Sequence, residues 1–177
     1  RYLSDVTPRS AGNAGAATLN LLGLGFVDGM RAELRRTGYP TIAADQVTRQ
    51  SATSLLAHLS LTTTTPITYD VVVIWPDAAE ERLAETFVVV PGLGPRFQAR
   101  LDLPSSHRAM RSVTARINYT NLGDADMPAP IIIATVFPTV SIKSPCDDTW
   151  YSGGVQLLAV NPREPAGTLP PGAQGQV

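Results

Sequence analysis

The fold is decided by residues Thr65–Pro145, which begin T-P-I-T-Y-D-V-V-V-I-W-P-D and end P-A-P-I-I-I-A-T-V-F-P-T-V-S-I-K-S-P. Three further segments lie between these ends: E-T-F-V-V-V-P-G at 85–92, R-F-Q-A-R-L-D-L-P at 96–104 and S-V-T-A-R-I-N-Y-T at 112–120. All five segments are rich in β-branched residues and are separated by proline, glycine or aspartate, a pattern typical of strands. Their length and spacing predict an all-β sandwich or barrel.

Hydrophobic alternation supports these strands, and similar segments occur outside the block. In Phe97–Leu103 apolar and polar residues alternate, which predicts a strand with one solvated face. Further strands are expected at 18–27, 55–62 and 155–160. Eight strand candidates with short connections favour an antiparallel eight-stranded jelly-roll sandwich. An immunoglobulin-type sandwich has similar strand statistics, but its Cys…Trp…Cys pattern is absent.

One or two short helices are expected beside the strands. Phe26, Met30 and Leu34 follow at intervals of four residues, which would place them on one face of a short amphipathic helix. Ser105 predicts a cap for a second helical turn over 107–111.

The chain of 177 residues is long enough for one domain with a substantial core. Residues 1–16 are small, polar and glycine-containing, so we expect an extended N-terminal arm. Residues 17–160 would form the jelly-roll domain. Residues 161–177 are rich in proline and glycine, and we expect a tail that cannot bury enough apolar surface to fold alone.

The charge of the chain is low and almost balanced. Apolar residues make up 44% of the sequence, charged residues make up 16%, and the net charge is −1. We therefore expect part of the surface to be covered, most simply by other copies of the chain. Without a run of lysine or arginine, a basic patch for nucleic acid is not expected. Arg31, Arg35 and Arg36 form the main basic cluster, which is interpreted first as the solvated face of a short helix.

No cofactor, metal centre or membrane span is expected. The single cysteine, Cys146, rules out an internal disulfide and a Cys-x-x-Cys metal site. No apolar run approaches the roughly 20 residues of a membrane span. Four aspartates could offer oxygens to calcium, but we interpret them as solvated loop carboxylates: Asp124, Asp126, Asp147 and Asp148.

One set of residues suggests catalysis. His58, Asp102 and Ser152, which precedes Gly153-Gly154, follow the chain order of the chymotrypsin-like serine proteases. The G-D-S-G-G motif of that family is absent, and Trp150 stands where the family has glycine. Ser152 is more simply a turn residue and His58 a strand residue, so we expect no enzyme and keep the protease as an alternative.

Three segments resemble the coat proteins of tymoviruses and related small icosahedral RNA viruses. Thr65–Ala78 is similar to that family's strand ending in tryptophan and proline, and Ala99–Val113 to its strand, helical turn and following segment. Pro128–Pro145 is similar to its last strand. The N-terminal portion has no clear counterpart, and the residues after Pro145 extend beyond the usual end of such coats.

The resemblance implies a jelly-roll capsid protein that self-assembles into an icosahedral shell around genomic RNA, so the expected location is the virion. Coats of this type lack a strongly basic arm, which fits the near-neutral charge. Arg31, Arg35 and Arg36 would then be the RNA-contact candidates, since arginine pairs well with phosphate. Two alternatives stay open: the serine protease above, and a non-viral β-sandwich binding module.

Overall fold

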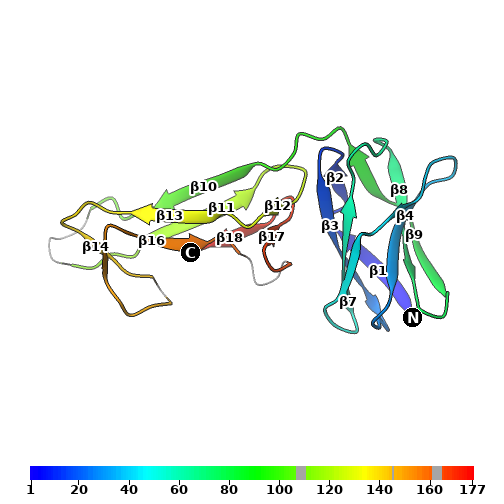
Figure 1. Ribbon diagram of the computed structural model, residues 1–177, viewed down its shortest axis with the longest axis horizontal. Coiled ribbons are helices and arrows are strands. Elements are labelled where there is room, and N and C mark those ends of the chain that lie inside the picture. The colour runs from blue at the N-terminus through cyan, green and yellow to red at the C-terminus, as the bar shows by residue number, and fades with distance from the viewer. Residues whose placement is uncertain (107–110, 145, 161–164) are drawn as a thin grey trace. The chain divides into compact units, whose positions relative to one another are not determined.

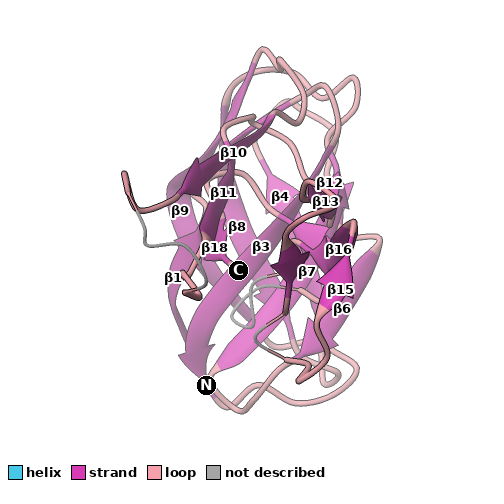
Figure 2. Cartoon of the chain, turned by 90° about the vertical axis from the view of Figure 1, so that its left-hand side faces the viewer, coloured by secondary structure: helices cyan, strands magenta, loops and turns pink. Residues whose placement is uncertain are grey.

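The computed structural model describes residues 1–106, 111–144, 146–160 and 165–177. These residues form strands, turns and loops without a helix (Figure 2), so the predicted all-β class is confirmed. Accordingly, the described part of the chain contains no helix long and apolar enough to cross a membrane.

The chain divides into two compact units instead of the single domain expected over 17–160. The proline- and glycine-rich loop at 91–95 ends the strands of the first unit, and the chain then enters a separate set of strands. Unit 1 consists of Arg1–Arg96, Leu122–Asp126 and Pro170–Gly172. Unit 2 consists of Phe97–Asn121, Met127–Leu169 and Ala173–Val177.

Unit 1 is a sandwich of two sheets (Figure 1). The first sheet contains, in spatial order, β1 (Tyr2–Thr7), β3 (Ala16–Leu24), β7 (Ser54–Ser60) and β6 (Gln46–Arg49). The second contains β2 (Ser10–Gly12), β9 (Glu80–Val90), β8 (Thr68–Ile74), β4 (Arg31–Arg35) and β5 (Ile42–Ala43). Neighbours are antiparallel except β2 and β9, which run parallel.

This strand order is that of an immunoglobulin-type sandwich. Lettered along the chain, the first sheet has the order A-B-E-D and the second contains G-F-C, the arrangement of immunoglobulin domains. The structure does not confirm the eight-stranded jelly roll. This order occurs here without the Cys…Trp…Cys pattern, because a cluster of apolar side chains packs between the two sheets where that pattern would place a disulfide.

The core of unit 1 lies between its two sheets. Leu19 and Leu59 from the first sheet and Val73 and Phe87 from the second are all almost completely buried in one cluster. Trp75, which follows β8, is also buried, and its indole Nε1 donates a hydrogen bond of 2.9 Å to the backbone oxygen of Gly25. The polar atom of this large side chain is therefore satisfied inside the core.

Residues 1–16 are part of this sandwich, so the expected extended arm is wrong. The pairing of β1 with β3 shifts register between Leu3 and Asp5, and this irregularity turns both Leu3 and Val6 toward the core. Ala11 in β2 is buried as well. A strict period of two is lost at the bulge, which hid the strand from sequence inspection.

The expected helix over residues 26–34 is a turn followed by a strand. Gly29 has a φ of 82°, which glycine adopts without strain, and β4 begins two residues later. Met30, Ala32 and Leu34 are buried at intervals of two, as the inner face of a strand requires. The second expected helical turn falls largely on residues 107–110, outside the described residues.

Unit 2 is also built from strands. Its main sheet contains, in order, β10 (Phe97–Asp102), β11 (Arg116–Asn121) and β18 (Gln174–Gln176). Three short antiparallel pairs complete it: β12 (Met127–Pro128) with β17 (Thr168–Leu169), β13 (Ile131–Thr135) with β16 (Gly154–Leu158), and β14 (Ser141–Ile142) with β15 (Tyr151–Ser152). The last segment of the block, at 128–145, forms two strands and not one: β13 ends before Pro138 and β14 begins after it, and proline lacks a ladder donor.

Most of the described part of the expected C-terminal tail belongs to unit 2, and Pro170–Gly172 belongs to unit 1. Leu169 and Ala173 are buried in the small core of unit 2, and β18 pairs with β11. The side-chain amide of the buried Asn121 donates a hydrogen bond of 2.9 Å to the backbone oxygen of Leu169. Residues 165–177 therefore fold by joining strands that come earlier in the chain, whereas 161–164 lie outside the described residues.

Candidate functional site

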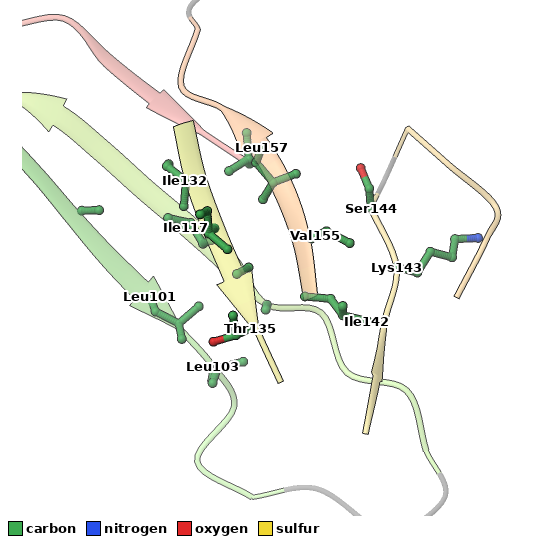
Figure 3. Close-up of a pocket in the computed structure, with 15 residues that line it drawn as sticks. Leu101, Leu103, Ile117, Ile132, Thr135, Ile142, Lys143, Ser144, Val155 and Leu157 are labelled. Carbon is green, nitrogen blue, oxygen red and sulfur yellow. The ribbon is translucent and has the colours of Figure 1, made fainter. Parts of the chain in front are cut away.

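An open apolar cleft of about 450 Å³ lies in unit 2 between the β10–β11 strands and the β13–β16 pair (Figure 3). Its size is in the range of small-ligand and side-chain pockets. Most of the lining is aliphatic, with the main contributions from Leu101, Leu103, Ile117, Ile132, Val155 and Leu157.

Unit 2 is well packed around Phe97 and Tyr119, at the start of β10. The rings of Phe97 and Tyr119 lie 6.3 Å apart, and Tyr119 donates a hydrogen bond from its hydroxyl to the backbone oxygen of Val160. Burial raises the pKa of the Tyr119 phenol. Gly175 lies opposite Tyr119 in the sheet, where a β-carbon would come within 2.3 Å of the ring. Glycine at this position lets the ring lie across β18.

The β10 side of the cleft is open, and β10 is also an edge strand. Leu101 and Leu103 point to the same side as Phe97, yet each is 56% exposed. Among the described residues, β11 is the strand that pairs with β10, and nothing pairs with its second edge. The cleft therefore has two half-exposed leucine side chains on the side of an unpaired sheet edge.

The opposite wall of the cleft is apolar on both of its faces. Ile132 lies opposite Leu157 in the β13–β16 pair and faces the cleft. Ile131, paired with Leu158, and Ile133 alternate with Ile132 and are 64% and 63% exposed. A run of consecutive apolar residues is typical of strands that are covered on both sides.

The mouth of the cleft has few polar groups. Lys143 lines it, and its ammonium donates a hydrogen bond of 2.6 Å to the carboxylate of the fully exposed Asp148. Ser144 and Thr135 add hydroxyl groups. No group of three or more metal-ligating His, Cys, Asp or Glu residues occurs in the part of the chain that the structure describes. Desolvation of aliphatic surface is therefore the chemistry that this cleft offers.

Two of the three residues of the protease alternative contact other groups. His58, on β7 in unit 1, has its Nδ1 3.6 Å from a carboxylate oxygen of Asp45. Asp102, in unit 2, accepts hydrogen bonds from Arg100 at 2.9 Å and from Asn118 at 2.6 Å. Ser152 lies in the short exposed strand β15. The partners of His58 and Asp102 differ from those that a catalytic triad needs.

Two of the RNA-contact candidates form ion pairs within unit 1. Arg35 contacts Glu80 at 2.8 Å and Glu33 at 2.8 Å, and both raise the pKa of its guanidinium. Arg36 contacts Glu85 at 2.7 Å, which likewise raises its pKa. Arg31 is exposed at the start of β4, on a strand and not on the helix face predicted. The charges of Arg35 and Arg36 are already balanced by carboxylates, which leaves less for phosphate.

Asp124 and Asp126 differ from the solvated loop carboxylates expected. The carboxylate of Asp124 accepts hydrogen bonds of 2.8 Å from the backbone amides of both Leu93 and Gly94. Asp126 accepts one of 2.5 Å from the buried Thr18, and its second oxygen is buried without a hydrogen-bond partner. Burial raises the pKa of the Asp126 carboxyl, against the opposite effect of Thr18. Both residues fix the segment Leu122–Asp126 within unit 1.

No family model matches the chain, and no curated protein is similar to it at a significant level.

Sequence inspection predicted strands that line the cleft, but it did not predict the cleft between them. One signal was available: the I-I-I-A run at 131–134 lacks the polar alternation of a strand with one solvated face. The openness of β10 had no comparable signal, since it depends on which strands pair with it.

Proposed function

We propose that this chain is a non-catalytic β-sandwich module that acts by binding other protein surfaces through the open apolar side of unit 2. The observation that supports it is the exposure of Leu101, Leu103 and Ile133, which line the same cleft and are each more than half accessible to solvent. Contiguous apolar surface of this kind marks interaction sites in soluble proteins. Unit 1, with its closed apolar core, serves as the folded support.

The binding module is favoured over the protease by the environment of the candidate triad. A serine nucleophile needs a histidine base within hydrogen-bond reach, and that base needs a carboxylate to orient it. Asp102 is held by Arg100 and Asn118, while the ring of His58 lies beside Asp45. These contacts account for both residues as members of structural polar pairs.

The coat-protein function stays a prediction from the sequence resemblance. The resembling block is divided in this structure, because residues 65–96 belong to unit 1 and most of 97–145 to unit 2. A coat subunit would need these segments in one jelly roll. The binding module requires only the exposed apolar side, so we favour it, and self-association is compatible with both functions.

Two measurements on the full chain test the proposal. An apolar dye, 1-anilinonaphthalene-8-sulfonate, should bind the native protein with enhanced fluorescence, and the Leu101→Ser/Leu103→Ser variant should lose most of this signal. A matched Tyr39→Ser variant removes an exposed large side chain of unit 1 that is not among the residues lining the cleft, and it should keep the signal. Equal dye fluorescence in all three proteins would contradict the proposal.

A fluorophosphonate serine probe gives the second measurement. The native chain should not be labelled. Labelling that disappears in Ser152→Ala would overturn the proposal in favour of the protease, and closed particles of uniform size in electron micrographs would overturn it in favour of the coat protein.

A further inference from the structure

We infer that two copies of this chain associate by antiparallel pairing of the outer edges of β10, with Arg100 of each copy opposite Asp102 of the other. The inference rests on the proposed function and deepens it, because it names a second copy of the chain as the partner of the open side of unit 2. Edge pairing of this kind would extend the three-stranded sheet of one copy into that of the next.

Among the described residues β10 pairs only with β11, and some of its backbone amides and carbonyls are directed away from β11. Ile117 of β11 exchanges two hydrogen bonds with Val177, at 2.7 and 3.0 Å. Odd-numbered residues of β11 therefore bond toward β18, and even-numbered ones bond toward β10. The hydrogen bond of 2.7 Å from the amide of Leu122 to the backbone oxygen of Arg96 follows the same alternation, because both residues are even-numbered.

The alternation of even- and odd-numbered residues determines which backbone groups of β10 lie on its open edge. Since β10 and β11 pair Arg100 with Asn118 and Asp102 with Arg116, the even residues of β10 use their amides and carbonyls toward β11. Those of Ala99, Leu101 and Leu103 consequently point to the open edge. These are also the residues whose side chains lie on the partly exposed inner face.

One antiparallel register satisfies both the backbone and the side chains. When Leu101 lies opposite Leu101 of the second copy, Ala99 lies opposite Leu103 in the same hydrogen-bonded set. Arg100 then lies opposite Asp102 in a non-hydrogen-bonded pair, where side chains approach most closely. Symmetry repeats this pair, so the edge is complementary to itself in both charge and apolar contact.

The neighbouring registers are unfavourable. A shift of two residues in one direction places Arg100 opposite Arg100, and a shift in the other direction places Asp102 opposite Asp102 and Arg100 opposite Pro104. Parallel pairing sets each charge beside its own copy. Like charges directly opposite one another destabilise a sheet, so only the register centred on Leu101 is favoured.

The charges are already arranged for this contact. The Nε of Arg100 lies 2.9 Å from the carboxylate of Asp102 in the same strand, and the Arg100 side chain is 83% exposed. A second copy would bring its own Arg100 and Asp102 beside this pair, with opposite signs adjacent along and across the strands. Such a group of four charges is accessible to salt, so the association should weaken as ionic strength rises.

Sedimentation velocity of the full chain over a range of concentrations tests the inference. The wild-type protein should form a dimer, and Arg100→Asp, which turns both attractive pairs repulsive, should raise the dimer dissociation constant by about tenfold or more. The double variant Arg100→Asp/Asp102→Arg should recover most of the wild-type value. Arg111→Asp, an identical charge change in an exposed loop residue, should leave it unchanged.

A backbone variant keeps the test independent of charge. Ala99→Pro removes an amide that points to the open edge, and proline is tolerated at such positions of edge strands. This variant should stay folded by circular dichroism and should be monomeric.

Either of two results would overturn the inference: a wild-type protein that is monomeric at every concentration, or a dimer that survives both Arg100→Asp and Ala99→Pro. A monomeric wild-type protein that still binds the apolar dye at Leu101 and Leu103 would overturn the self-pairing alone and would leave the proposed function standing.

Discussion

Replacing Asp124 by alanine is expected to lower the free energy of unfolding of unit 1 by about 2–3 kcal/mol. Its carboxylate accepts hydrogen bonds of 2.8 Å from the amides of Leu93 and Gly94. A hydrogen bond to a charged group contributes about 1.5–3 kcal/mol, and this full value applies to the partly buried Gly94 amide. The Leu93 amide is exposed, so water can replace the carboxylate there and the loss is smaller.

The two tryptophans allow this loss to be measured in unit 1 alone. Trp75 is buried in the core of unit 1, whereas Trp150 is exposed in unit 2. In a Trp150→Phe background, tryptophan fluorescence during guanidinium chloride unfolding therefore follows unit 1. Asp124→Ala should move the midpoint to lower denaturant with an unchanged slope. The control Asp28→Ala removes a side chain that is 88% exposed and lies 3.9 Å from Arg49, and it should leave the midpoint where it is.

A double-mutant cycle tests the same contact from the other side. A β-carbon on Gly12 would lie 2.5 Å from the Asp124 carboxylate, so Gly12→Ala should destabilise unit 1 in the wild-type background. With Asp124→Ala the obstructing atoms are gone, and the second substitution should cost much less. An Asp124→Ala loss no larger than that of Asp28→Ala, or strictly additive effects of the pair, would refute the reasoning.

Three further predictions concern other buried groups. Burial raises the pKa of Asp126, so the stability that its protonated carboxyl contributes is fully present below pH 3.8 and is lost as the pH rises through the raised pKa. Asp126→Asn should therefore have a higher melting temperature than wild type at pH 7, and the difference should vanish at low pH. Gly175→Ala should destabilise unit 2 by about 1–3 kcal/mol, seen as faster hydrogen exchange in β11, because the new methyl group meets the Tyr119 ring. Asp70→Ala should lower the unfolding free energy of unit 1 by about 2–4 kcal/mol in the Trp75 assay, because the buried carboxylate accepts the amide of Glu85 at 2.7 Å; an unchanged midpoint would show that water replaces it.

The sequence predicted most strands where alternation and punctuation agree. The strand expected in the first segment of the block, which begins at Thr65, matches β8, and the strand expected at 97–103 matches β10. Proline ends the first, and polar residues alternate through the second. The helix expected at 26–34 was wrong because Met30 and Leu34 fit a period of four and also a period of two once Ala32 is counted. Short apolar segments cannot be assigned to one period from spacing alone.

The division into units and the site depended on pairings that local sequence does not encode. Leu101 has the same strand pattern as Phe97, yet one is half exposed and the other packs against Tyr119. The difference lies in which distant strands cover each end of β10. Asp124 likewise looked like a loop carboxylate, because its partners at 93–94 come thirty residues earlier in the chain.

Unit 1 is assembled from three separate stretches of the chain, and this affects when the molecule can finish folding. A chain made from its N-terminus delivers Leu122–Asp126, with the Asp124 contacts, only after β10 and β11 have been synthesised. Pro170–Gly172 follows still later, after nearly all of unit 2. Domains made of one continuous stretch can fold in turn as they leave the ribosome. Here the first unit completes its contacts only after most of the second has been made, and a gene cut between residues 96 and 97 would separate Arg1–Arg96 from the other two stretches of unit 1.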